Sequence, residues 1–274
     1  MLRVSLICFA ASLAIALSGF LFKAWSMLST EPVLVEPLPR VAHAGGGIGG
    51  EIYTNSKEAI LSSLERGFEL VELDFSWTAD GALVCIHDWE SNFSRLVGSE
   101  VPEPLDLEAF KQARNGAAFH LLTLLELKEL MMENPRLKIV TDVKSNSLEA
   151  LRLMAEEMPE LASRIYPQIY RPNEYEIVRS LGFESIIWTL YNYSHGKNIA
   201  RIVEELEGRD LFAVCMPRDL VKDGHALRLS ELGISTYAHT INSPAEWREL
   251  RDRWGVTQVY TDFLPARSSS QDGP

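Results

Sequence analysis

The stretch FELVELDFSWTADGALVCIHDW, residues 68–89, decides the fold. Its Asp80-Gly81 dipeptide is a strong signal for a two-residue hairpin turn, because the central residues of such a turn need a positive φ that Asp and Gly tolerate. A turn centred on this pair places Asp74 directly opposite His87 on the neighbouring strand. The sequence therefore predicts a β-hairpin that joins a carboxylate to an imidazole, and a slip of one residue would separate them.

Strands and helices alternate on both sides of this hairpin. The expected strands are 41–45, 70–78, 83–87, 137–144, 165–169, 185–191, 211–216, 234–240 and 258–261. Helical patterns lie between most of them, among them 56–66, 124–132, 148–157, 173–181, 199–206 and 244–254. This alternation across 274 residues predicts an α/β fold in which a parallel sheet closes into a (β/α)8 barrel of the TIM type. An open, doubly wound sheet is the alternative.

The strand before the turn carries two acids on one face. Side chains alternate along a strand, so Glu72 shares the face of Asp74. Carboxylates in this arrangement suit two hard oxygen ligands on one Mg²⁺ or Ca²⁺. Val71, Leu73 and Phe75 make the other face apolar and are expected to pack against helices. The two charges then lie inside the barrel, where they need a cationic partner. An amphipathic strand with a wet outer face is the alternative.

A third acid lies in the segment LKIVTDVK, residues 137–144. Asp142 and Lys144 share one parity with Val140, so both charged groups face one side of a buried strand. An acid in such a strand is costly unless it is paired. We interpret Asp142 as a third metal ligand and Lys144 as a cation that neutralises a phosphate. A simple contact between Asp142 and Lys144 is the alternative.

A histidine and a glycine run follow the first expected strand, in RVAHAGGGIGG, residues 40–50. His43 and His87 near one metal-bound phosphate can divide the proton transfers, one accepting and the other donating. A histidine satisfied within the core is the alternative for His43. The backbone N–H groups of Gly45 and Gly46 can approach an anion, although a mobile loop fits the same letters.

Two further segments are less specific. Asn55, with Glu58 three residues later, is typical of a helix cap. Residues 88–122 interrupt the alternation of strands and helices, with one helical pattern at 107–113 and no obvious strand. A long excursion after a barrel strand often shapes the binding mouth. A surface insertion without a role is the alternative.

Composition bounds the class of protein. Hydrophobic residues make up 46% of the chain and charged residues 23%, as expected for a globular protein with a sizeable core. The net charge of −12 disfavours nucleic acid as a partner, because an acidic surface repels phosphate backbones. A phosphate-ester substrate would need a local cation. Cys8, Cys85 and Cys215 share no close spacing and predict neither a disulfide framework nor a zinc site.

The N-terminal segment is typical of a membrane anchor. Residues 4–22 contain no charged side chain and lie between Arg3 and Lys23. As a helix they span about 28 Å, close to the roughly 30 Å hydrocarbon core of a bilayer. We interpret residues 1–27 as an uncleaved signal anchor; a cleaved signal peptide, or a helix buried in the globular part, are the alternatives.

The remaining domain boundaries follow from composition. Residues 28–39 are expected to form a linker, residues 40–266 the barrel, and residues 267–274 a disordered tail. The charge imbalance around the apolar segment favours an N-terminus inside the cell. The expected localisation is therefore a single-pass membrane protein with an extracytoplasmic catalytic domain, or a secreted or periplasmic protein if the segment is cleaved.

Seven segments, in this order, resemble the glycerophosphodiester phosphodiesterase family. They are HAGG (43–46), NS-x-x-A (55–59), ELDFSWTADGALVCIHD (72–88), TLLEL (123–127), VTDVK (140–144), YAHTIN (237–242) and VYTDFLP (259–265). The 72–88 segment is the specific part, and the resemblance covers residues 40–266. It implies a barrel of the phospholipase-C-like phosphodiesterase superfamily, with a hairpin at the second and third strands. By the same resemblance, His43 and His87 are the acid–base pair, and Glu72, Asp74 and Asp142 hold the metal.

Four departures from the family pattern leave the substrate open. Ala44 stands where Arg usually follows the first histidine, and residues 53–56 read Tyr-Thr-Asn-Ser where the family has Pro-Glu-Asn-Thr. Asp142 replaces the usual Glu, which looks like the sphingomyelinase D branch. His239 replaces a common tryptophan. We expect the substrate contacts to come from Lys144, Gly45, Gly46, Asn55 and His239.

The expected activity is hydrolysis of a phosphodiester, a glycerophosphodiester or a lysolipid-type headgroup substrate, by two histidines and one Mg²⁺ or Ca²⁺. A sphingomyelinase D-like or phospholipase D-like lipid lyase is one rival. The other is a non-catalytic, membrane-tethered barrel that binds phosphate or lipid. Five retained ionisable groups disfavour this last interpretation, because a site without turnover has no reason to bury them.

Overall fold

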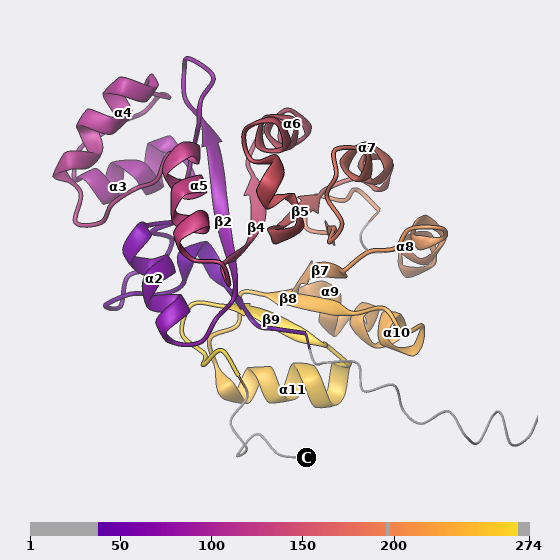
Figure 1. Cartoon of the computed structure of the whole chain (residues 1–274). Coiled ribbons are helices and arrows are strands. Elements are labelled where there is room, and N and C mark those ends of the chain that lie inside the picture. Colours follow the sequence, from indigo (N-terminus) through magenta and orange to yellow (C-terminus); the bar gives the residue numbers. More distant parts are fainter. Residues whose placement is uncertain (1–37, 196–197, 268–274) are drawn as a thin grey trace, which may run out of the picture. The chain divides into compact units, whose positions relative to one another are not determined.

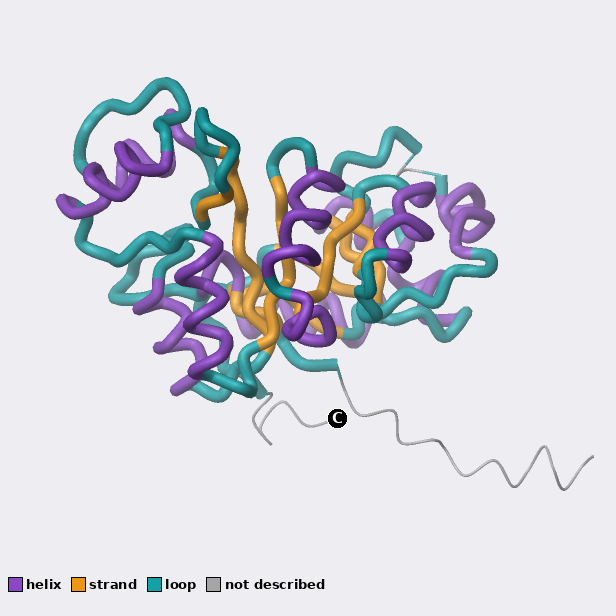
Figure 2. Tube along the Cα trace, turned by 45° about the horizontal axis from the view of Figure 1, so that its top comes forward, coloured by secondary structure: helices purple, strands orange, loops and turns teal. Residues whose placement is uncertain are grey.

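Eight parallel strands close into a barrel (Figures 1 and 2) in the computed structural model, which describes residues 38–195 and 198–267. The strands are β1 (Val41–Ala42), β2 (Leu70–Trp77), β4 (Lys138–Val143), β5 (Ile165–Ile169), β6 (Ile187–Thr189), β7 (Ala213–Pro217), β8 (Thr236–His239) and β9 (Gln258–Thr261). Each strand pairs with its neighbour, and β1 pairs with both β2 and β9. The closure confirms the predicted barrel and contradicts an open sheet.

Helices surround the strands (Figure 2). The α-helices are α2 (Lys57–Glu65), α3 (Ser94–Val97), α4 (Leu107–Ala113), α5 (Leu124–Glu133), α6 (Ser147–Glu157), α7 (Tyr175–Ser180), α8 (Ile199–Leu206), α9 (Arg218–Lys222), α10 (His225–Glu231) and α11 (Pro244–Trp254). Shorter 3₁₀ turns cover His43–Gly45, Arg114–Gly116, Pro159–Arg164 and Pro172–Glu174, and a π turn covers Trp89–Phe93. Helix starts follow the local chemistry: Thr123 and Glu126 form a capping box at α5.

Two apolar layers place the acids of β2. Val71, Leu73 and Phe75 are fully buried in the layer that packs against the helices, as their parity predicts. Leu70 faces the other way and belongs to a smaller cluster with residues of the other strands, which fills the barrel interior. Glu72 lies on the same face of β2 as Leu70, two residues further along the strand. Its carboxylate is therefore inside the barrel, between the apolar cluster and the end where the strands finish.

The predicted hairpin is present, but its predicted register is wrong by one residue. β3 (Leu83–Val84) pairs antiparallel with β2, and Trp77 lies opposite Leu83. The expected pairing of Asp74 with His87 does not occur, because the ladder ends at Val84 and the next amide, of Cys85, donates to the carbonyl of Leu122 at 2.8 Å. His87 therefore reaches the barrel mouth through the loop after β3 and not through strand pairing.

The side chain of Thr78 accounts for the slip. The amide of Thr78 donates to the carbonyl of Ala82 at 2.8 Å, and its hydroxyl accepts from the amide of Ala82, also at 2.8 Å. Three residues, 79–81, are thus left in the loop, and Gly81 takes the positive φ of 84°. A three-residue loop with glycine at the left-handed position is the next most common hairpin connection after the two-residue turn.

The excursion 88–122 folds as a small helical unit beside the hairpin (Figure 1). It contains α3 and α4, and its apolar side chains form a separate cluster with Val84 and Ile86. Trp89, Phe93 and Phe110 have ring centroids within 5.1–6.0 Å of one another. The unit therefore carries its own core, and it begins directly after His87.

The predicted anchor and nearly all of the predicted linker and tail lie outside the described residues. Within residues 38–195 and 198–267, none of the helices has the length and apolar character needed to cross a bilayer.

Candidate active site

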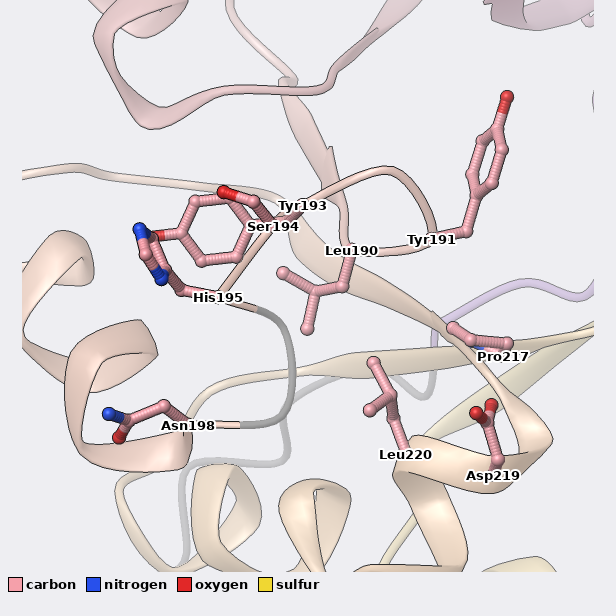
Figure 3. Close-up of a pocket in the computed structure, with 9 residues that line it drawn as sticks. All are labelled: Leu190, Tyr191, Tyr193, Ser194, His195, Asn198, Pro217, Asp219 and Leu220. Atoms are coloured by element: carbon pink, nitrogen blue, oxygen red, sulfur yellow. The ribbon is translucent and has the colours of Figure 1, made fainter.

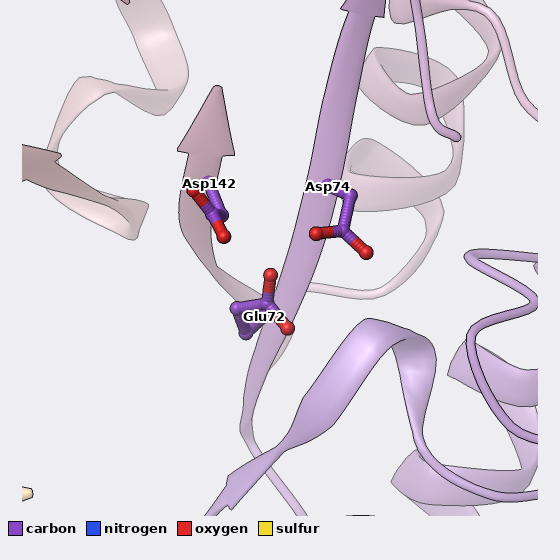
Figure 4. A group of neighbouring side chains, drawn as sticks. All are labelled: Glu72, Asp74 and Asp142. Carbon is purple, nitrogen blue, oxygen red and sulfur yellow. The ribbon is translucent and has the colours of Figure 1, made fainter. Parts of the chain in front are cut away.

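Three carboxylates meet at the end of the barrel where the strands finish (Figure 4). Glu72 and Asp74 come from β2, and Asp142 comes from β4, whose register sets it beside Asp74. One oxygen of each side chain lies within 4.8 Å of an oxygen of the other two. Glu72 and Asp74 are buried. Three carboxylates this close are costly to ionise together unless a cation lies beside them.

The donor set fits a divalent metal. One oxygen of Glu72 accepts the Ala44 amide at 2.7 Å, while its Oε1 is buried without a hydrogen-bond partner among the described residues. Burial and the charge of Asp74 raise the pKa of Glu72 to about 8 when no metal is bound. Carboxylate oxygens are the ligands that Mg²⁺ and Ca²⁺ prefer. Glu72, Asp74 and Asp142 are thus the residues that would hold such an ion.

Lys144 supplies the cationic partner within the chain. Its Nζ lies 2.6 Å from Asp74 Oδ1 and 2.7 Å from Asp142 Oδ2. Burial opposes the charge of Lys144, but the charges of Asp74 and Asp142 outweigh it and hold the pKa of the ammonium above its usual value. The contact with Asp142 that the sequence offered as the alternative is therefore present, together with a second contact to Asp74.

Asn55 holds the carboxylate of Asp74 in place. Its Nδ2 donates to Asp74 Oδ2 at 2.9 Å, and its Oδ1 accepts the Asp74 amide at the same distance. The expected helix cap is wrong, because Asn55 adopts a left-handed φ of 49° and the cap of α2 is Ser56, whose Oγ accepts the Ala59 amide at 3.2 Å. With both ends of its amide engaged, Asn55 fixes the orientation of Asp74.

His43 is oriented by a carboxylate from the last strand. Its Nδ1 lies 2.9 Å from Asp262 Oδ1, and Asp262 Oδ2 accepts from Asn242 Nδ2 at 2.7 Å. Burial opposes protonation of His43, but the bond to Asp262 and the charge of Glu72 outweigh it and raise its pKa to about 9 when no metal is bound. The other ring nitrogen, Nε2, is thereby left for chemistry.

His87 is held in a comparable way. Its Nδ1 lies 2.7 Å from Asp88 Oδ2, and Asp88 also accepts the amides of Ser91 and Asn92 at 2.7 and 2.9 Å. Burial acts against ionisation of Asp88, but these hydrogen bonds outweigh it and lower its pKa to about 2. Asp88 is thus ionised at neutral pH and orients His87.

Tyr53 lies between the two imidazoles. Its ring centroid is 4.7 Å from that of His43 and 5.2 Å from that of His87, edge-on in both cases. The backbone of Tyr53 has a φ of 56°, and its carbonyl accepts from Asn92 Nδ2 at 2.8 Å. Burial and the charge of Asp74 raise the pKa of its phenol. The ring thus packs between the two histidines, and Asn92 of the helical excursion holds the backbone of Tyr53.

Gly45 and Gly46 were predicted to contact the substrate through their backbone N–H groups, but the N–H group of Gly46 is engaged within the turn. The Gly46 amide donates to the carbonyl of His43 at 2.7 Å, and the carbonyl of Gly45 accepts from Ser63 Oγ at 2.7 Å. A Cβ at Gly46 would lie 2.2 Å from that same Oγ, and its φ is 92°. The run therefore lets the turn after β1 pack closely on α2.

His239 ends β8 and faces the same mouth. Its ring lies 6.2 Å from that of Tyr191 and 6.3 Å from that of Tyr260, and its Nε2 is buried without a partner among the described residues. Burial and the charge of His43 lower the pKa of His239 to about 4. It is therefore a neutral ring at neutral pH.

Two cavities open between the loops that follow the strands. One, of about 460 Å³, lies between the loops that follow β6 and β7, with Tyr193 and His195 on one side and Pro217 and Asp219 on the other (Figure 3). The second, of about 700 Å³, adjoins Lys144. Tyr191 lines both of them.

Several of these residues were not predicted from the sequence to belong to the site. Asp262 and Asn242 lay inside quoted segments, VYTDFLP and YAHTIN, without an assigned role. An acid directly after the last strand was the available signal. Tyr53 was noted only as a departure from a family pattern. Tyr170, whose hydroxyl donates to Asp142 Oδ1, gave no signal in the sequence.

Comparison with known proteins agrees with this geometry. The model of the glycerophosphoryl diester phosphodiesterase family matches residues 46–266. Mouse lysophospholipase D GDPD3 is 27% identical over 155 residues, which are 52% of this chain and 45% of the mouse protein. The chain thus matches less than half of the length of that relative.

Solved structures share the fold. A glycerophosphodiester phosphodiesterase from Thermotoga maritima is 22% identical, with a TM-score of 0.59 over 81% of this chain and 93% of its own. A Parabacteroides distasonis enzyme of the same description is 18% identical, with a TM-score of 0.61 over 83% and 93%. An Oleispira antarctica phosphodiesterase, solved with the product sn-glycerol-3-phosphate, is 19% identical, with a TM-score of 0.61 over 84% and 94%. At these identities the likeness concerns the fold.

Proposed function

The chain belongs to the glycerophosphoryl diester phosphodiesterase family, and from that premise we propose that it hydrolyses a phosphodiester at a single divalent cation. One observation carries the proposal: Glu72, Asp74 and Asp142 present oxygens within 4.8 Å of one another, and one buried oxygen of Glu72 has no hydrogen-bond partner among the described residues. Such a cluster costs free energy unless a cation occupies it.

The three carboxylates would hold Mg²⁺ or Ca²⁺, which when bound neutralises the charge that develops on the phosphate oxygens. Lys144 adds a second positive charge from the side of β4. Its Nζ contacts two of the proposed ligands, so it lies where a metal-held phosphate would come within reach.

The two histidines divide the proton work. Each imidazole has its Nδ1 on a carboxylate, His43 on Asp262 and His87 on Asp88, which leaves Nε2 as the working atom of both rings. One Nε2 accepts the proton of the attacking hydroxyl, and the other donates to the oxygen of the leaving alcohol. The attacking hydroxyl is that of water, or that of the substrate itself if a cyclic phosphate forms.

The substrate is proposed to be a glycerophosphodiester. The Oleispira antarctica relative, which shares the barrel, was solved with sn-glycerol-3-phosphate as its product. A lysolipid-type substrate is the second candidate, because Phe263 is 47% exposed directly after Asp262 and offers an apolar surface beside the site. The mouse relative is a lysophospholipase D. Asp142 also keeps a lipid-lyase reaction of the sphingomyelinase D kind as a rival.

The cellular setting is proposed from the sequence. Residues 4–22 carry no charge, so we infer a single-pass anchor with the barrel outside the cytoplasm. Membrane fractionation of cells expressing the full chain, followed by N-terminal sequencing, checks this. An intact N-terminus in the membrane fraction supports the anchor, and a soluble chain that begins near residue 27 contradicts it.

Turnover by the purified protein tests the function. Glycerophosphocholine, glycerophosphoinositol, lysophosphatidylcholine and sphingomyelin are each supplied with Mg²⁺, with Ca²⁺ or with EDTA, and the released products are identified by mass spectrometry. EDTA-sensitive release of an alcohol from a glycerophosphodiester supports the proposal. A cyclic product from a lipid favours the lyase, and no turnover on any substrate favours a binding protein. Hydrolysis that survives in a His43→Ala, His87→Ala double variant excludes the assigned acid–base pair.

A further inference from the structure

The cavity beside Lys144 is part of the barrel mouth. It has a volume of about 700 Å³ and is walled by the loops that follow β4, β5 and β6. Lys144 belongs to this wall and at the same time contacts Asp74 and Asp142. The volume falls in the range of roughly 300–1,000 Å³ that is usual for small-molecule sites. A group attached to a phosphate at the acidic cluster would therefore extend into it.

The wall combines aromatic rings with uncharged polar groups. Tyr170 and Tyr191 have ring centroids 6.0 Å apart and nearly perpendicular planes. The hydroxyl of Tyr170 is fixed by Asp142 and by the carbonyl of Val143, so its ring is held in place. Ser145 and Asn192 add a hydroxyl and an amide from the neighbouring loops. Aromatic faces with hydrogen-bonding groups beside them suit the apolar faces and the hydroxyls of a polyol.

The charge exposed in the wall disfavours a cationic guest. Arg171 is exposed in the cavity and forms no ion pair with any residue in 38–195 or 198–267. The rim pair of Arg152 and Glu149, 3.7 Å apart, is neutral as a unit. Glu174 balances this charge formally, but it is buried, and its Oε2 accepts the amides of Tyr170 and Arg171. The exposed guanidinium of Arg171 is therefore the charge that a guest in the cavity contacts. It repels an ammonium group and can donate to hydroxyl oxygens.

We propose that this cavity is the subsite for the leaving alcohol and that it selects a hydroxyl-rich alcohol without positive charge, such as a cyclic polyol. The assignment rests on the proposed phosphodiesterase activity. In that reaction the bond between phosphorus and the alcohol oxygen breaks, water supplies the new oxygen on phosphorus, and a proton passes to the alcohol. The free alcohol then leaves through the opening between the β4, β5 and β6 loops.

Competition between two diesters tests the subsite. With saturating Mg²⁺ or Ca²⁺, kcat/KM is measured for glycerophosphoinositol and for glycerophosphocholine, which differ only in the leaving alcohol. The proposal predicts a preference of about tenfold or more for the inositol diester, which corresponds to one or two additional hydrogen bonds. A preference for the choline diester contradicts it.

Variants locate the source of the preference. Arg171→Gln should lower the ratio of kcat/KM for the inositol diester to kcat/KM for the choline diester about two- to tenfold. The first value should fall and the second should rise. Arg228→Gln makes the same change of net charge on α10, where Arg228 pairs with Glu231, and should leave the ratio unchanged. An equal change in both variants would mean general electrostatic steering and would overturn the assignment.

A binding measurement separates this subsite from the proposed activity. Inositol 1-phosphate and phosphocholine, phosphate monoesters that keep each leaving alcohol attached to phosphorus, are titrated calorimetrically into the metal-loaded protein and into Arg171→Gln. Tighter binding of inositol 1-phosphate, weakened by the substitution, supports the subsite even if neither diester is hydrolysed, in which case only the activity fails. Equal or tighter binding of phosphocholine contradicts the subsite, whatever the turnover.

Discussion

His43 and His87 are oriented in the same way. The Nδ1 atom of each imidazole contacts a carboxylate that other residues hold in place. Asn242 fixes Asp262, and two backbone amides fix Asp88. A histidine whose Nδ1 is held in this way has a defined tautomer and ring orientation, as general acid–base catalysis requires. The carboxylates are therefore expected to matter almost as much as the rings.

Asp262→Asn tests this expectation for His43. The substitution keeps the shape but removes the charge, so kcat should fall about 10²-fold or more, within the range that a positioned acid or base contributes. In metal-free protein the pKa of His43, raised to about 9, should move down toward its ordinary value. NMR titration of the ring gives the pKa and steady-state kinetics gives kcat. An unchanged titration with reduced kcat would mean that Asp262 acts by another route.

Tyr53 is expected to act through its ring. Its edge-on contacts with both imidazoles survive in Tyr53→Phe and are lost in Tyr53→Ala. We predict that kcat of the Phe variant stays within about threefold of wild type, whereas the Ala variant loses about tenfold or more, because a misplaced acid or base is costly. Kinetics of both variants, with circular dichroism as the folding control, decides this. Equal losses in both would assign the role to the hydroxyl.

Much of the site was predictable at this scale because strand parity is local. Glu72, Asp74 and Asp142 face the barrel interior for the same reason that Val71 and Leu73 face the helices. Contacts that form only when the barrel closes could not be predicted from the sequence. Asp262 lies 219 residues from His43, and no local pattern brings them together.

At the scale of the elements, the turn after β1 and helix α2 pack closely against each other. The turn after β1 packs on α2 so tightly that a Cβ at Gly46 would lie 2.2 Å from Ser63 Oγ. Gly49, three residues after Gly46, has a positive φ of 59° but nothing within 4 Å of an added Cβ. The two positions differ in this contact and also in backbone conformation, because Gly46, with φ 92° and ψ 158°, lies in a region almost confined to glycine.

Substitution by alanine at both positions measures that difference. Gly49→Ala should cost about 1–2 kcal/mol, the penalty for a left-handed residue. Gly46→Ala should cost about 1–3 kcal/mol more, because the contact with Ser63 and the glycine-specific backbone conformation both add to it, and should lower Tm by a further several degrees. Thermal unfolding of both variants gives the comparison. Equal shifts would show that α2 yields to the added methyl group.

The hairpin shows why element prediction can succeed while register fails. Each of the nine expected strand ranges holds a strand, because β-branched runs and turn residues mark them clearly. The register of β3 depended on a single hydroxyl, that of Thr78, which binds the Ala82 amide and lengthens the loop to three residues. The mechanism survives the slip because the loop after β3 and the helical excursion position His87 instead.

At the scale of the whole molecule, the acidic cluster links folding to pH. The pKa of Glu72 is raised from 4.5 to about 8 in the metal-free fold. A carboxyl group whose pKa is raised by folding stabilises the fold below its unfolded pKa, and this contribution is lost as pH rises through the folded pKa. His43, raised from 6.5 to about 9, changes stability in the same direction.

His239, whose pKa is lowered from 6.5 to about 4, changes stability in the opposite direction below pH 6.5. The metal-free protein should therefore lose stability between about pH 6.5 and pH 9. Thermal unfolding in EDTA across this range should show Tm falling, and Mg²⁺ or Ca²⁺ should raise Tm most at the alkaline end, where the carboxylates are ionised. Glu72→Gln should flatten the fall, because the amide does not titrate. A Tm in EDTA that rises with pH would contradict the account of this cluster.

The central claim is that Glu72, Asp74 and Asp142 bind one divalent cation on which hydrolysis depends. The most direct measurement strips the protein with EDTA and follows hydrolysis of a glycerophosphodiester as Mg²⁺ or Ca²⁺ is added back. Wild type should recover its rate with a saturable, single-site dependence, and Glu72→Gln should fall short by more than about 100-fold, beyond the usual cost of losing a residue that merely supports a ligand. A rate that persists in EDTA, or that is equal in the two proteins, would contradict the claim.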